Sequence, residues 1–193
     1  IMMRVASALP SDYKEIFSVD LKKDKKVAVL VNGLSAVIAI IMIIAMYACV
    51  PISTLGGLQI WVRVAVLAVS IVLYIVLHEF VHGITMKMFG TKKVKYGFHG
   101  LYASAGSDDY YDIKSYIIIA LAPIVVWGII LAIVNFIVPT EWFWIVYIIQ
   151  IINISGAAGA MYVTVKFSGF PKDILIKDYG VGMTVYSKQT LDR

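Results

Sequence analysis

The sequence has little that could build a thiol-based site. It contains one cysteine, Cys49, so it can form neither an internal disulfide bond nor a zinc cluster of several thiolates. Charged residues are also scarce, at 15% of the chain, and they cluster between long apolar stretches. These two shortages exclude a disulfide-rich secreted domain and argue against a water-soluble helical bundle, whose helices carry charges along one face.

Apolar side chains are what the sequence has in abundance. They make up 61% of the residues, and the mean hydropathy is +0.87. A lipid bilayer is therefore the predicted surroundings of the chain. The net charge of +5 would suggest a nucleic-acid partner in a soluble protein, but here we assign it to lysines at a membrane surface and expect no nucleic-acid binding.

Four apolar runs are long enough to cross the hydrocarbon layer, which needs about 20 helical residues. We predict one integral-membrane domain over residues 1–193, of the all-α polytopic class, with spans at about 27–50, 58–88, 113–138 and 142–167. A cytoplasmic N-terminus then places every Lys and Arg except Arg63 on the cytoplasmic side. The sequence thus predicts a multi-pass protein of the cell membrane with both termini in the cytoplasm.

A short β-hairpin is predicted between the second and third spans, at about residues 92–104, on the cytoplasmic side. Val94, Tyr96 and Phe98 alternate with polar or small residues, which is typical of a strand. The returning strand is predicted at residues 101–103, with the turn at His99 and Gly100. The fold expected from the sequence is therefore four transmembrane helices with one small hairpin after the second.

The second span ends in the sequence His78-Glu79-Phe80-Val81-His82. Two histidines four residues apart on a helix project from one face, so they can ligate one Zn²⁺, with Glu79 as the catalytic acid and base. The alternative is a polar helix end at the membrane interface without a metal. A charged group at hydrocarbon depth costs about 3 kcal/mol, and a metal is a partner that offsets this cost. This favours the zinc site.

Together with several other motifs, the histidine motif makes the chain resemble the putative zincin peptidase family of small bacterial four-span membrane proteins. The motifs are Asp12-Tyr13-Lys14-Glu15-Ile16, the basic run into Val31-Asn32, Leu77 to Gly83, Ala120-Leu121-Ala122-Pro123, and Pro171-Lys172-Asp173 leading to Asp178. More distantly, the order of motif helix, hairpin and later helix is similar to site-2 proteases, zinc enzymes that cut substrate helices inside the membrane. The resemblance implies a zinc metalloprotease that performs intramembrane proteolysis.

The third zinc ligand that this resemblance implies is missing from its expected place. We expect an aspartate directly after a glycine in the fourth span, but Ala160 follows Gly159 there. Either the ligand comes from elsewhere, with Asp173 and Asp178 as the nearest candidates, or the chain has lost it through a natural or engineered change. The second explanation is slightly favoured. Two histidines alone predict weaker zinc binding and impaired catalysis.

Asn153 is a polar residue inside the fourth predicted span. It could bind the backbone of a substrate, or it could form a hydrogen bond between helices, which is the more common role. The leading functional hypothesis is a membrane-embedded zinc metalloprotease that cuts hydrophobic or membrane-associated peptides by water attack. The alternative is a non-enzymatic membrane module that binds metal and hydrophobic peptides or partner proteins. The sequence does not indicate an oligomeric state.

Overall fold

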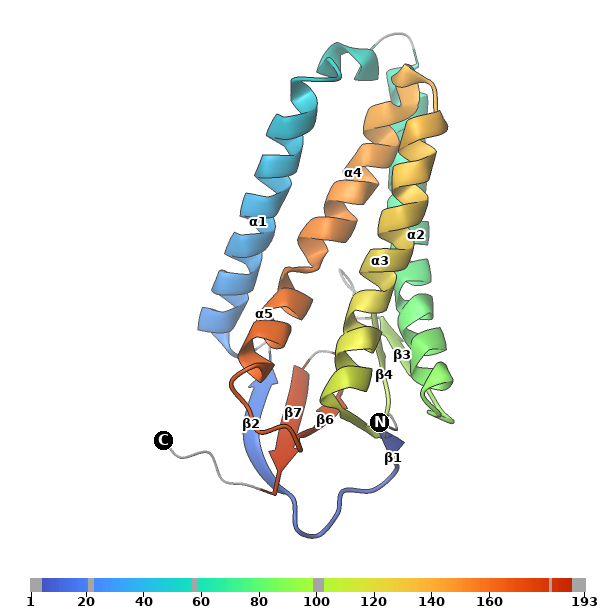
Figure 1. Ribbon diagram of the computed structural model, residues 1–193. Coiled ribbons are helices and arrows are strands. Elements are labelled where there is room, and N and C mark those ends of the chain that lie inside the picture. The colour runs from blue at the N-terminus through green and yellow to red at the C-terminus, as the bar shows by residue number, and fades with distance from the viewer. Residues whose placement is uncertain (1–4, 21–22, 57–58, 99–102, 181, 189–193) are drawn as a thin grey trace.

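A computed structural model of the chain shows a bundle of helices with a β-sheet at one end (Figure 1). The structure describes residues 5–20, 23–56, 59–98, 103–180 and 182–188. Its helices are α1 (Lys25–Tyr47), the short 3₁₀ helix η1 (Ile52–Leu55), α2 (Ile60–Met88), α3 (Ile113–Ile137), α4 (Thr140–Gly156) and α5 (Ala158–Phe167). Within the described residues, four helical segments are long and apolar enough to cross a membrane: α1, α2, α3 and the run α4–α5.

The helices differ in how much of their surface other helices cover. All residues of α1 are described, and none of them is buried, whereas about half of the most apolar part of α4–α5 is buried. In the structure α4 packs against α1, α2 and α3. Large apolar side chains on α1, α2 and α3 face outward, among them Ile44, Val69 and Ile133. An apolar outer surface of this extent is what a lipid-facing bundle requires.

The prediction of an all-α fold is wrong, because the structure contains a five-stranded antiparallel sheet and a separate two-stranded sheet. The larger sheet has the strand order β1-β5-β6-β7-β2. Its strands are β1 (Val5–Ala6), β2 (Lys14–Asp20), β5 (Tyr110–Asp112), β6 (Leu175–Asp178) and β7 (Gly182–Ser187). The strands are short, and β2 pairs with β7 from the other end of the chain, so no local pattern revealed their pairing.

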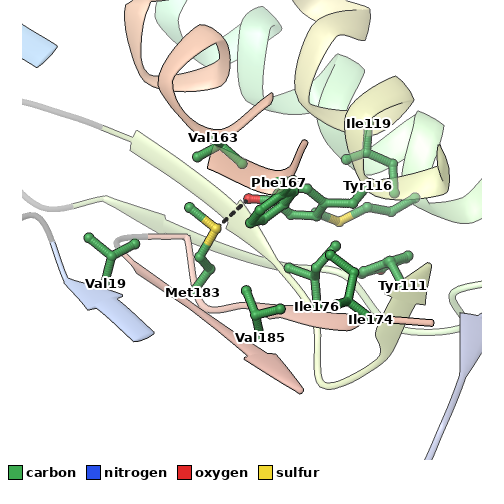
Figure 2. Close-up of a cluster of buried hydrophobic side chains, with 11 residues drawn as sticks. Val19, Tyr111, Tyr116, Ile119, Val163, Phe167, Ile174, Ile176, Met183 and Val185 are labelled. Carbon is green, nitrogen blue, oxygen red and sulfur yellow. Dashed lines mark hydrogen bonds between the residues drawn. The ribbon is translucent and has the colours of Figure 1, made fainter. Parts of the chain in front are cut away.

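The core of the molecule at this end lies between the large sheet and the ends of the helices (Figure 2). The sheet contributes Val19, Tyr111, Ile176 and Val185 among others, and these side chains are at most 4% exposed. Opposite them lie buried side chains from α2, α3 and α5: Met86, Tyr116, Ile119, Val163 and Phe167. The sheet therefore closes the end of the bundle and fixes the relative positions of these three helices.

The small sheet consists of β3 (Lys95–Phe98) and β4 (Ala103–Gly106), which pair in antiparallel register. It lies in the region of the predicted hairpin, but β4 extends past the predicted end at about residue 104. The predicted turn at His99 and Gly100, and residues 101 and 102 of the predicted return strand, fall outside the described residues. The Tyr96 hydroxyl occupies the space that a β-carbon on Gly83 would need. The glycine after the histidine motif thus allows the Tyr96 side chain of β3 to lie directly against α2.

The fourth apolar run is two helices in the structure. Helix α4 ends at Gly156 and α5 begins at Ala158, and Ala157 between them keeps a right-handed helical backbone. Small residues around this junction, namely Gly156, Gly159 and Ala160, line an internal cavity. The chain therefore has its least bulky segment where the helices approach the sheet.

Candidate metal centre

The candidate site is centred on three side chains of α2: His78, Glu79 and His82. Their potential ligand atoms lie within 4.8 Å of one another, and all three residues are partly buried. The two imidazole rings have centroids 5.1 Å apart, as expected for residues one helical turn apart. In the part of the chain that the structure describes, this is the one such group of three His, Cys, Asp or Glu residues. The structure thus brings together the trio that the sequence predicted.

The trio borders a cavity of about 300 Å³ at the junction of the helix bundle and the sheets. Helix α2 forms one wall, and α3 and the α4–α5 junction form two others. Strand β4 and the segment that joins β6 to β7 also line it. Its lining includes His78, Glu79, His82, Tyr116, Ile119, Ala160 and Asp178. The space is large enough for an ion, water and part of a peptide.

The His82 ring is oriented by helix α3. Its Nδ1 atom lies 2.9 Å from the backbone carbonyl oxygen of Ile119. A carbonyl oxygen can only accept a hydrogen bond, so Nδ1 must carry the proton. In the neutral ring this leaves the Nε2 lone pair free, which is the form of histidine that binds a metal.

The His78 ring is oriented by a chain of side-chain hydrogen bonds. Its Nδ1 atom lies 2.9 Å from the Tyr74 hydroxyl, and that hydroxyl donates to Oδ1 of Asn153 at 3.0 Å. Because the Tyr74 proton is directed to Asn153, the Nδ1–H of His78 donates to the Tyr74 oxygen. Asn153 in turn donates from Nδ2 to the carbonyl oxygen of Ile124 at 3.1 Å. The chain links α2, α4 and α3 and again leaves Nε2 free.

These contacts fit a zinc ion. Zinc prefers imidazole nitrogen, thiolate and carboxylate ligands, and a catalytic zinc keeps one position open for water or substrate. His78 and His82 supply two nitrogens whose protons are held on the side away from the ligand atom. Each ring also has the outer hydrogen-bond partner that metal-ligating histidines usually have.

Glu79 is held by strand β4. The backbone amide of Ala105 forms a hydrogen bond to the Glu79 carboxylate, and Asp178 is near enough to act on it electrostatically. The amide belongs to the strand that pairs with β3, so the position of Glu79 depends on the small sheet. A carboxylate held beside two imidazoles that can bind a metal is placed to exchange protons with a water molecule between them.

The structure places the three positions that bear on a third ligand differently. Ala160 lines the cavity from α5, so a carboxylate at this position would border the same cavity as the trio. Asp173 lies at the sheet, where it accepts hydrogen bonds from the Ser187 hydroxyl and the Lys188 amide, and it does not line the cavity. Asp178 lines the cavity but is not part of the close ligand group.

Asp178 already has two partners of its own. Its carboxylate accepts hydrogen bonds from the Tyr116 hydroxyl at 2.8 Å and from the Gly180 amide at 2.6 Å. Burial raises the pKa of this carboxyl, although both hydrogen bonds lower it. Gly180 has a positive φ of 81°, and a β-carbon there would collide with Ser104 of β4. The glycine therefore brings Asp178 and β4 together beside the cavity.

Sequence reasoning missed Tyr74, Ala105 and Tyr116 as parts of the site. Tyr74 precedes His78 by one helical turn, so its spacing was a usable signal. The contributions of Ala105 and Tyr116 depend on tertiary packing and left no signal in the sequence. Asn153 was predicted as a residue for substrate or for helix contacts. It is fully buried, does not line the cavity, and makes the interhelical contacts described above.

Comparison with known proteins agrees with the site's composition. The sequence profile of a family described as "Putative zincin peptidase" matches residues 71–175, which is more than half of the chain. The matched region contains the three residues of the trio, together with Pro123 and Asn153. Neither the search of curated proteins nor the search of solved structures gave a match. The extent of the family match shows that the chain belongs to the putative zincin peptidase family.

Proposed function

We propose that this protein is a membrane-embedded zinc endopeptidase that cuts hydrophobic or membrane-associated peptides. The observation that carries the proposal is the trio of His78, Glu79 and His82, grouped within 4.8 Å beside an internal cavity. Membership of a zincin peptidase family supports zinc as the metal and peptide hydrolysis as the reaction. His78 and His82 would hold the zinc through their Nε2 atoms.

The residues around the cavity have separate roles in the proposed reaction. A bound zinc ion supplies Lewis acidity that activates a water molecule and polarises the peptide carbonyl. Glu79 accepts a proton from the attacking water and later transfers it to the departing amine. The Ala105 amide holds the Glu79 carboxylate toward the cavity during both transfers. Apolar lining residues such as Ile119 and Val163 favour a hydrophobic substrate segment.

The proposed location is the cell membrane, with the sheet and both termini in the cytoplasm. The lengths and apolar surfaces of α1, α2, α3 and α4–α5 support four spans. The described Lys residues lie at or near the sheet end, whereas Arg63 binds the carbonyls of Thr54 and Gly56 at the opposite end. This asymmetry follows the positive-inside rule. The cavity would then lie near the cytoplasmic surface, where a substrate peptide can reach it.

A second candidate function is a metal-binding membrane module without catalysis. It is favoured by Ala160, because this residue lines the cavity but offers no ligand atom. In this case the cavity would hold a hydrophobic peptide or part of another protein without cutting it. Zinc held by two histidines would serve the structure of the site.

The two functions are distinguished by metal content and hydrolysis in purified, bilayer-reconstituted protein. We expect about one zinc per chain and cleavage of a hydrophobic reporter peptide. Glu79→Gln should retain the zinc and lower the cleavage rate about 10²–10⁴-fold, because it removes the proton acceptor. His78→Ala is the matched control that should lose the zinc. Cleavage that persists in Glu79→Gln would remove this residue from the mechanism, and zinc without any turnover would support the module.

A further inference from the structure

Pro123 lies inside α3 and is fully buried. Proline has no backbone N–H, so it cannot donate the helical hydrogen bond to the carbonyl four residues earlier. That carbonyl belongs to Ile119, which is 2% exposed. A buried carbonyl without a partner is costly, and therefore Ile119 needs a donor from outside its own helix.

The donor is His82 of α2, whose Nδ1 lies 2.9 Å from the Ile119 oxygen. We propose that Pro123 is a positioning residue for the metal centre, because it reserves the Ile119 carbonyl for His82 and so fixes which ring nitrogen faces the cavity. The inference rests on the proposed function in one respect, namely that His82 binds zinc. The link from Pro123 to the His82 proton is independent of that function.

The same segment of α3 also fixes the other ring. Residues 119–124 of α3 include the Ile119 carbonyl, which accepts the His82 proton, and the Ile124 carbonyl, which accepts an amide proton of Asn153. Because Asn153 donates from Nδ2, its Oδ1 faces Tyr74 and the direction of the chain to His78 is set. Both imidazoles are thus oriented by backbone carbonyls on either side of Pro123.

A purely structural role for Pro123, such as a bend in α3, makes a different prediction. A bend would affect packing and stability but would not require a particular proton position on His82. The proposed role requires that an N–H introduced at position 123 competes with His82 for the Ile119 carbonyl. The two roles therefore differ in the tautomer of one side chain.

The test is Pro123→Ala in the full-length protein in lipid bilayers, with ¹⁵N-labelled histidines and no metal. Imidazole ¹⁵N shifts at alkaline pH report the neutral tautomer, and His82→Gln assigns the signal. In the unaltered protein His82 should be almost entirely protonated on Nδ1. In Pro123→Ala this population should fall, and zinc affinity should fall about 10–100-fold, as is usual for loss of an outer partner of a metal ligand.

Two further variants make the result decisive. Pro139→Ala is the matched control, because Pro139 precedes α4 at the other end of the bundle and should leave the tautomer and zinc affinity unchanged. Pro123→Gly introduces the same backbone N–H without a side chain, so it tests the same competition for the Ile119 carbonyl if Pro123→Ala fails to fold. It should lower the population of His82 that is protonated on Nδ1, as Pro123→Ala does.

Each outcome has a defined meaning. An unchanged His82 tautomer in folded Pro123→Ala would overturn the inference, as would an unaltered His82 that is protonated on Nε2. If Pro123→Ala does not fold, an unchanged His82 tautomer in Pro123→Gly would overturn it. Failure of the unaltered protein to bind zinc would contradict the proposed function, but the metal-free tautomer measurement would still decide the role of Pro123.

Discussion

The two ends of the α4–α5 run show opposite ways of filling the space between helices. In the half remote from the sheet, Trp144, Tyr147 and Ile151 are buried against α1 and η1. Near the sheet, Gly156, Gly159 and Ala160 take their place and border the cavity. The part of this run that contains Trp144, Tyr147 and Ile151, the packed half, thus holds the helices together. The part that contains Gly156, Gly159 and Ala160, the hollow half, borders a space that can accept ligands.

Buried polar side chains at the boundary between the two halves form hydrogen bonds to other helices. Asn153 lies between the aromatic residues and the glycines, and its side chain bonds to Tyr74 and to α3. Gln150, one turn earlier, donates to the Gly128 carbonyl. Hydrogen bonds between helices in the apolar region compensate for the small size of the neighbouring side chains. The hydrogen bonds of Asn153 and Gln150 therefore lie between the packed half and the cavity.

The largest effect is expected from a cavity in the packed half. Trp144→Ala removes a side chain that is 3% exposed and should lower the free energy of unfolding by about 3–5 kcal/mol. Zinc stoichiometry of the folded fraction should stay unchanged, because the site lies at the other end. Denaturant titration in bicelles measures the first quantity and elemental analysis the second. A loss of zinc from folded Trp144→Ala would show that the two halves are not independent.

The next effect concerns the hollow half. Ala160→Asp places a carboxylate in the cavity opposite the two histidines and should raise zinc affinity about tenfold or more, which corresponds to about 1.4 kcal/mol. Competition with a chelator measures the affinity. Ala160→Asn is the control of similar size without the charge and should give a much smaller gain. Equal affinities of the two variants would place residue 160 out of reach of the metal.

Gly83→Ala tests the contact of the hollow half with the small sheet. The added methyl group would collide with the hydroxyl end of the Tyr96 ring, and this exposed side chain would have to move aside. A side chain forced off its rotamer costs about 0.5–1.5 kcal/mol. In a Tyr96→Ala background the cost of Gly83→Ala should be smaller, because the colliding ring is absent. Thermal unfolding of the single and double variants gives the values, and an equal cost in both backgrounds would exclude the collision as the cause.

The smallest effect is expected outside both halves, at the sheet surface. Lys188 forms an exposed ion pair with Asp12 at 2.8 Å, and this pair lowers the pKa of the Asp12 carboxyl. A carboxyl whose pKa is lowered in the folded state stabilises the fold at pH values above the ordinary aspartate pKa. This stabilisation is lost as the pH falls through the lowered pKa. Lys188→Ala should therefore change the melting temperature little at neutral pH and not at all in strong acid. A large loss at neutral pH would show that the pair holds β7 in place.

Local patterns in the sequence were sufficient to predict the helices and the trio. The apolar runs are long and contain few charged residues, and the spacing of His78 and His82 is a property of a single helix. The large sheet could not be predicted, because its five strands come from both ends of the chain and from the segment before α3. For the same reason the amide of Ala105 and the carbonyl of Ile119 were not identifiable. Backbone groups have no sequence signature and become part of a site only through packing.

Strand order has a consequence for the time at which the cavity can form. Strand β7, residues 182–187, pairs with β2 and β6 and borders the cavity through Gly182 and Met183. During translation, α2 with the side chains of the trio emerges about a hundred residues before this strand. The nascent chain therefore carries the trio long before the cavity beside it is complete, and the cavity can form only when β7 has joined the sheet.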